Sequence, residues 1–124
     1  MEGPTDQLVA RSGMPSSVPV ARRLVRGALP GCPRADDLLS AATELASNAI
    51  THSASGQYGT FTMRVRTAPR WARLEVTDQG TREGPPSPSN GWGLTIVGGV
   101  TDRAGTLTQL DGKRVAWCEV SWPA

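Results

Sequence analysis

The sequence is poor in the residues on which metal, disulfide and membrane proteins depend. Its 124 residues include two cysteines, one histidine, one phenylalanine and one tyrosine. Cys32 and Cys118 have neither CxxC spacing nor a second pair of ligands, which argues against a structural zinc site. A disulfide between them stays open, although a reducing compartment disfavours it. The chain has no run of about 18 apolar residues and no apolar N-terminal segment, so we expect a soluble, cytoplasmic protein without a membrane partner.

Charge of one sign is also scarce. The formal net charge is +2, from 13 basic residues, all but one of them arginine, and 11 acidic residues. The basic residues are spread along the chain, so this small excess gives no argument for direct binding to nucleic acid. The length predicts a single domain over residues 1–124 with one hydrophobic core.

The spacing of the apolar residues predicts two helices followed by two hairpins. A helix capped by Ser16 or Ser17 is expected to run to about Leu29, and a second one to follow Pro33 and end by Gly56. Strands are predicted at 8–11, 61–65, 71–77, 106–110 and 114–122, with a short helix after residue 93. This order predicts an α/β two-layer sandwich, in which a mixed, mostly antiparallel sheet carries the helices on one face.

The second helix sets two polar side chains one turn apart beside an apolar face. At about 100° per residue, Glu44, Asn48 and His52 line one edge of that face. Asn48 has the oxygen that Mg²⁺ prefers as a ligand, and Glu44 is placed to orient or deprotonate a nucleophile. The plain alternative is an amphipathic helix with polar shoulders, in which His52 only meets the negative end of the helix dipole.

Two glycine motifs follow further along the chain. Asp78-Gln79-Gly80 comes directly after the predicted strand 71–77, and Asn90-Gly91-Trp92-Gly93-Leu94 opens a short apolar segment. Between the two motifs, residues 81–90 hold three prolines and form a predicted loop that covers a ligand or merely connects two elements. Each glycine motif alone could equally be an ordinary turn.

Taken together, the three motifs resemble a known family. In the order E-x-x-x-N, D-x-G and G-x-G, the chain resembles the GHKL (Bergerat-fold) ATPases over about residues 11–120. It is most similar to the small anti-sigma-factor serine kinases and their actinobacterial relatives. ELASNAITHS matches the N box of that family, VTDQG its G1 box and GWGL its G2 box.

The resemblance implies an ATP site. Asp78 would accept the exocyclic amine of adenine, and Gly80 would let the backbone pass close to the base. Gly91 and Gly93, with Leu94 after them, would present amide groups to the phosphates at the start of a helix. Residues 81–90 would form the nucleotide lid.

The resemblance also implies a cation, a reaction and partners. Asn48 would hold Mg²⁺ between the phosphates, and Glu44 would act as the base toward a protein serine. The expected partners are a sigma factor and a small antagonist protein of the STAS type, and a homodimer is possible, with 18–29 or an exposed Trp71 at its surface. A non-catalytic module that uses ATP only to regulate a partner is the second hypothesis. The catalytic domain of a sensor histidine kinase is disfavoured, because His52 is the only histidine and lies in the N box.

The chain departs from the family pattern on its last strand. Many relatives carry a threonine there that supports the adenine-binding carboxylate, and Val115 falls where its hydroxyl is expected. Thr77 could compensate. Trp92, inside the second glycine motif, is bulkier than the residues often found there.

Overall fold

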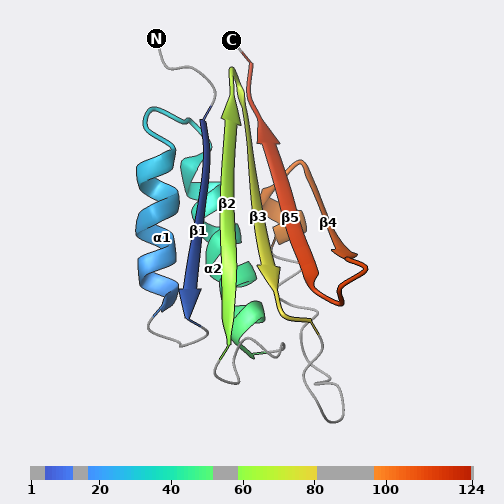
Figure 1. The fold of residues 1–124 in the computed structure, drawn as a ribbon. Coiled ribbons are helices and arrows are strands. Elements are labelled where there is room, and N and C mark those ends of the chain that lie inside the picture. The colour runs from blue at the N-terminus through green and yellow to red at the C-terminus, as the bar shows by residue number, and fades with distance from the viewer. Residues whose placement is uncertain (1–4, 13–16, 52–58, 81–96, 124) are drawn as a thin grey trace.

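The computed structural model describes residues 5–12, 17–51, 59–80 and 97–123. They form a sheet layer and a helix layer, with both helices behind the sheet (Figure 1). The elements are β1 (Thr5–Ser12), α1 (Ser17–Ala28), α2 (Ala35–Thr51), β2 (Thr60–Ala68), β3 (Trp71–Asp78), β4 (Arg103–Thr108) and β5 (Arg114–Ser121). This confirms the predicted two-layer α/β fold. Among the described residues, no helix is long and apolar enough to cross a membrane.

The sheet has the strand order β1-β2-β3-β5-β4, and every neighbouring pair is antiparallel. The expected antiparallel character therefore holds for all the described strands, and no parallel pair occurs among them. Both hairpin turns lie between the strands predicted to flank them, although β4 spans Arg103–Thr108 and not 106–110. Pro69 and Arg70 join β2 to β3, with Arg70 at a φ of 62° as in a type II turn. In the β4–β5 turn Gly112 has a φ of 87°, which glycine adopts without strain.

The core lies between the two layers. Helix α1 buries Ala21, Val25 and Ala28, which recur at the three- and four-residue spacing of one helix face. Strands β2 and β3 bury every second residue over most of their lengths, which is the alternation expected of a sheet covered on one side. The residues of α2 that complete this core are Leu38, Leu39, Ala41, Ala42, Leu45, Ala46 and Ala49.

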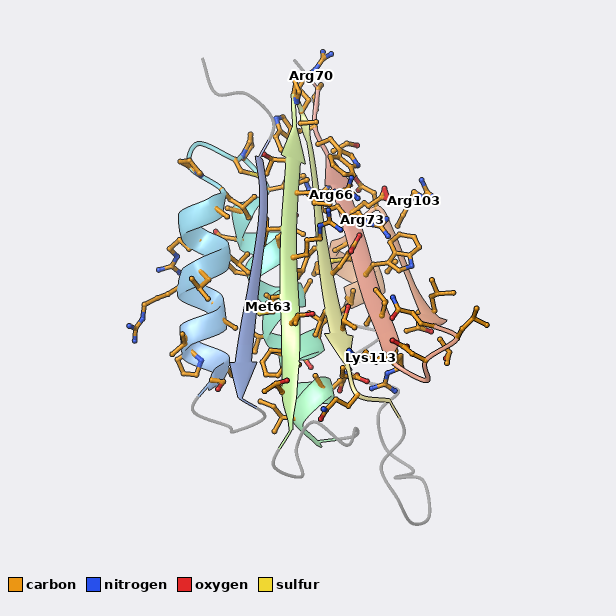
Figure 2. The ribbon with its side chains drawn as sticks, in the orientation of Figure 1. Met63, Arg66, Arg70, Arg73, Arg103 and Lys113 are labelled. Carbon is orange, nitrogen blue, oxygen red and sulfur yellow. The ribbon has the colours of Figure 1, made fainter. Side chains whose placement is uncertain are left out.

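The other face of the sheet carries a charged and aromatic cluster. The Arg73 guanidinium lies between two carboxylates, with its Nε 2.7 Å from Glu75 and its Nη1 2.6 Å from Glu119. It also lies 4.4 Å from the centre of the Trp117 ring. Figure 2 shows Arg66, Arg73 and Arg103 on this side of the sheet. Trp71, expected to be exposed, is half-buried here.

Both cysteines are free. Cys118 is fully buried in the core, while Cys32 is half-buried. Burial raises the pKa of the Cys118 thiol to about 12, because the buried site disfavours the thiolate. Cys118 is therefore an inert core residue.

Candidate functional site

Three segments that are distant in sequence meet at one end of the sheet. Strand β3 ends there at Asp78, β5 begins there at Arg114, and the C-terminal end of α2 lies behind them (Figure 1). Asp78 has the same parity as Ala72, Leu74 and Val76, so its side chain is on the helix-facing side of the strand. Its side chain is only 3% exposed.

A buried carboxylate needs partners, and Asp78 has them on both oxygens. Its Oδ1 accepts a hydrogen bond from the backbone N–H of Gly80 at 2.8 Å. Its Oδ2 accepts two more from Arg114, from Nε at 3.1 Å and from Nη2 at 2.8 Å. The two donors of the guanidinium fork converge on this one oxygen, and these charge-assisted bonds help to fix the orientation of the carboxylate.

The Arg114 contact corrects the expectation for the last strand. In the register of β3 and β5, Asp78 lies opposite Arg114, while Val115 lies opposite Thr77. Successive residues of a strand point to opposite faces, so Val115 and Thr77 share the face away from the helices. Arg114, and not Val115, therefore stands beside the carboxylate, and Thr77 does not take the place of the missing hydroxyl.

One signal in the sequence could have found Arg114. The inward-facing residues of the last strand are Ala116, Cys118 and Val120, which cross-pair with the inward residues of β3. Arg114 has the same parity as these three residues. Counting back two positions from Ala116 places it inward, level with the end of the preceding core strand.

Gly80 is required by the backbone itself. It has a φ of 84°, in the left-handed region that favours glycine. A Cβ at this position would collide with the carbonyl oxygen of Gly112 in the β4–β5 turn. The loop after β3 is thus packed directly against that turn, and this need for glycine exists without any ligand.

The two polar residues of α2 lie at the rim of the core, as predicted. Glu44 and Asn48 are half-buried, and their neighbours Leu45 and Ala49 are buried. This places both residues on the half of α2 that leads to the end of the sheet where Asp78 lies (Figure 1). Their proposed roles as base and magnesium ligand stay predictions.

A small open hollow lies at this end of the sheet, mainly on the face away from the helices, to which Thr60, Thr62 and Thr77 point. It has a volume of about 60 Å³ and is lined by Thr60, Phe61, Thr62, Thr77, Asp78, Gln79 and Lys113. Neither Glu44 nor Asn48 is among these lining residues. The hollow is smaller than the roughly 300 to 1,000 Å³ of most ligand pockets. The predicted lid at 81–90, the second glycine motif with Gly91, Gly93 and Leu94, and His52 lie outside the described residues.

The described residues resume after residue 96 with a helical turn over 97–100. Arg34 connects this turn to the rest of the fold by hydrogen bonds. Arg34 donates from Nη2 to the carbonyl of Val100 at 3.0 Å and from Nη1 to Asp102 at 2.7 Å. Asp102 also accepts the backbone N–H of Ser121 at 2.8 Å. The hydrogen bond from Arg34 holds the pKa of Asp102 below its usual value, and the pKa of Arg34 is raised by the same contact.

The described residues contain no cluster of three or more His, Cys, Asp or Glu side chains able to bind a metal alone.

Comparison with protein families identifies the fold. A model of the histidine kinase-like ATPase domain matches residues 14–116. The chain belongs to this family. Its membership confirms the GHKL-type resemblance and implies ATP as the ligand, and the three motifs all fall within the matched residues. No curated protein matches the chain.

Proposed function

We propose that this member of the histidine kinase-like ATPase family is a protein serine kinase of the anti-sigma-factor type. It would bind ATP with Mg²⁺ and transfer the γ-phosphate to a serine of a small STAS-type antagonist protein. A sigma factor would be its other partner, and the phosphorylation state of the antagonist would decide which of the two is bound.

The geometry at the end of β3 is the observation that carries this proposal. Asp78 is buried on the helix-facing side at the end of β3, and Gly80 and Arg114 fix its orientation. A carboxylate that is fixed before a ligand arrives can accept a hydrogen bond without further ordering, which favours binding. Such an acceptor fits the amino group of adenine.

The reaction assigns separate tasks to the residues of α2. When bound, the nucleotide and its cation supply the phosphoryl group and balance its charge. Glu44 would accept the proton of the serine hydroxyl as the serine oxygen attacks the γ-phosphorus and the bond to the β-phosphate oxygen breaks. Asn48, one turn later, would offer its side-chain oxygen to the cation. The amides of Gly91 and Gly93 would face the phosphates.

Transfer of labelled phosphate tests the kinase assignment. The purified protein is incubated with γ-labelled ATP, Mg²⁺ and a recombinant STAS-type protein encoded near its gene, and the wild type is compared with Glu44→Gln. We expect label on the antagonist with the wild type and at least about a hundredfold less with the variant, the usual size of a general-base contribution. Ser40→Ala, an exposed position on α2 one turn earlier, is the matched control and should leave the transfer unchanged.

The alternative outcome separates the second hypothesis. Tight ATP binding without transfer to the antagonist would contradict the kinase and leave a non-catalytic module that regulates a partner. Equal transfer by Glu44→Gln and by the wild type would remove Glu44 from the reaction.

A further inference from the structure

The hydrogen bonds to Asp78 occupy most of the acceptor positions of its carboxylate. An ionised carboxylate offers about four acceptor positions, two on each oxygen. Arg114 takes both positions on Oδ2, and the N–H of Gly80 takes one on Oδ1. Within the described residues, a single acceptor position therefore remains on Oδ1.

Arg114 has donors to spare. A guanidinium carries five N–H groups. Two of them bind Asp78, and the described part of the chain gives no partner to the other three. The Arg114 side chain is 29% exposed, compared with 3% for Asp78. The pair thus presents one acceptor next to several donors.

We propose that Arg114 reads the purine base together with Asp78, donating to ring nitrogen N1 and selecting adenine over guanine. This inference rests on the proposed binding of ATP. The hydrogen-bonding edge of adenine has one donor, the 6-amino group, beside one acceptor, N1, and this matches the pair. In the same pose guanine presents an acceptor, O6, to the carboxylate and a donor, N1–H, to the guanidinium, so both contacts are mismatched.

Guanine in the same pose would bring two acceptors together at Asp78 and two donors together at Arg114. Each contact would leave a buried or half-buried polar group of the protein unpaired, and this penalty falls on guanine alone. A site whose polar groups are left unpaired by the wrong ligand discriminates strongly against that ligand.

A cycle of protein and ligand changes tests the contact directly. ATP and its 1-deaza analogue, which has carbon in place of N1, are titrated calorimetrically into the wild type and into Arg114→Ala. In the wild type we expect the analogue to bind about tenfold more weakly, as for loss of one hydrogen bond to a charged group. In Arg114→Ala the two ligands should bind equally, because the donor to N1 is gone.

Titration of GTP into the same proteins tests the selection of the base. The preference for ATP over GTP should fall by about tenfold or more in Arg114→Ala, because the guanidinium that opposes guanine N1–H is then gone. Arg103→Ala, an exposed arginine on β4 that is 71% exposed and pairs with Glu119, is the matched control and should change neither ratio. Arg114→Lys keeps the charge but not the fork, and serves in the same cycle if the alanine variant does not fold.

The possible results are distinct. An equal loss for the 1-deaza analogue in the wild type and the variant would overturn the contact with N1. If the ratio of ATP to GTP affinity is the same in Arg114→Ala and in the wild type, Arg114 does not select the base, and its ion pair with Asp78 is only structural. A folded wild type that binds neither nucleotide would overturn the proposed function and this inference with it.

Discussion

Replacing Gly80 with alanine tests how closely the loop after β3 is packed. At a φ of 84° a non-glycine residue costs about 1 to 2 kcal/mol. The new Cβ would also meet the carbonyl oxygen of Gly112, a backbone atom that moves only with the whole β4–β5 turn. Overpacking of this kind costs a further 1 to 3 kcal/mol or so. The smaller entropy of the unfolded alanine chain offsets up to about 1 kcal/mol of this cost. We therefore expect Gly80→Ala to lower the free energy of unfolding by about 2 to 4 kcal/mol, which urea denaturation would measure.

Two other glycines separate the two contributions. Gly31 and Gly112 also have positive φ values, of 72° and 87°, but a Cβ at either position meets nothing within 4 Å. Their alanine variants should show only the backbone term, about 1 kcal/mol each after the smaller entropy of the unfolded chain is counted. If Gly80→Ala destabilises the protein no more than Gly112→Ala does, the close approach of the loop and the turn is refuted.

Three further predictions follow from other contacts. The pKa of Asp102 is lowered by Arg34, so the stability from this contact is present above the unfolded-state value near 3.8 and is lost as the pH falls through the lower folded value. Unfolding measured from about pH 6 to pH 2 should therefore show a smaller loss in Asp102→Asn than in the wild type, and identical slopes would contradict this. In the folded protein a thiol reagent at neutral pH should modify Cys32 much faster than Cys118, whose pKa is about 12. Mass spectrometry after partial labelling measures the two rates, and faster modification of Cys118 would contradict the prediction. Asn48→Ala should weaken ATP binding in the presence of Mg²⁺ by about tenfold and leave the melting temperature unchanged; an equal affinity would show that Asn48 is not the cation ligand.

The helices and most strands could be predicted from the sequence because burial of one face makes apolar residues recur at a regular spacing. In β2, alternation of Phe61, Met63 and Val65 with polar residues marks a strand covered on one face. Strand β4 shows the opposite case. It was expected at 106–110 but spans Arg103–Thr108, and only Gly105 along it is not fully exposed. A strand whose residues are nearly all exposed carries no apolar alternation, so the sequence could not mark its start.

The site was predictable where a motif lies within one segment and not where two strands meet. The turn at Gly80 and the burial of Asp78 both follow from a D-x-G motif at the end of a core strand. The contact of Asp78 with Arg114 depends on the register between β3 and β5, which is set by the packing of the whole sheet. Counting one residue differently along the last strand exchanges Arg114 for Val115 and turns an ion pair into an apolar contact.

Calorimetric titration of ATP into the wild type and into Asp78→Asn, in the presence of Mg²⁺, tests the central claim most directly. The claim is that the carboxylate buried at the end of β3 holds the base of the nucleotide. It predicts that the wild type binds one ATP per chain and that a folded Asp78→Asn protein binds it at least about tenfold more weakly. Equal affinity for ATP in the two folded proteins would contradict the claim.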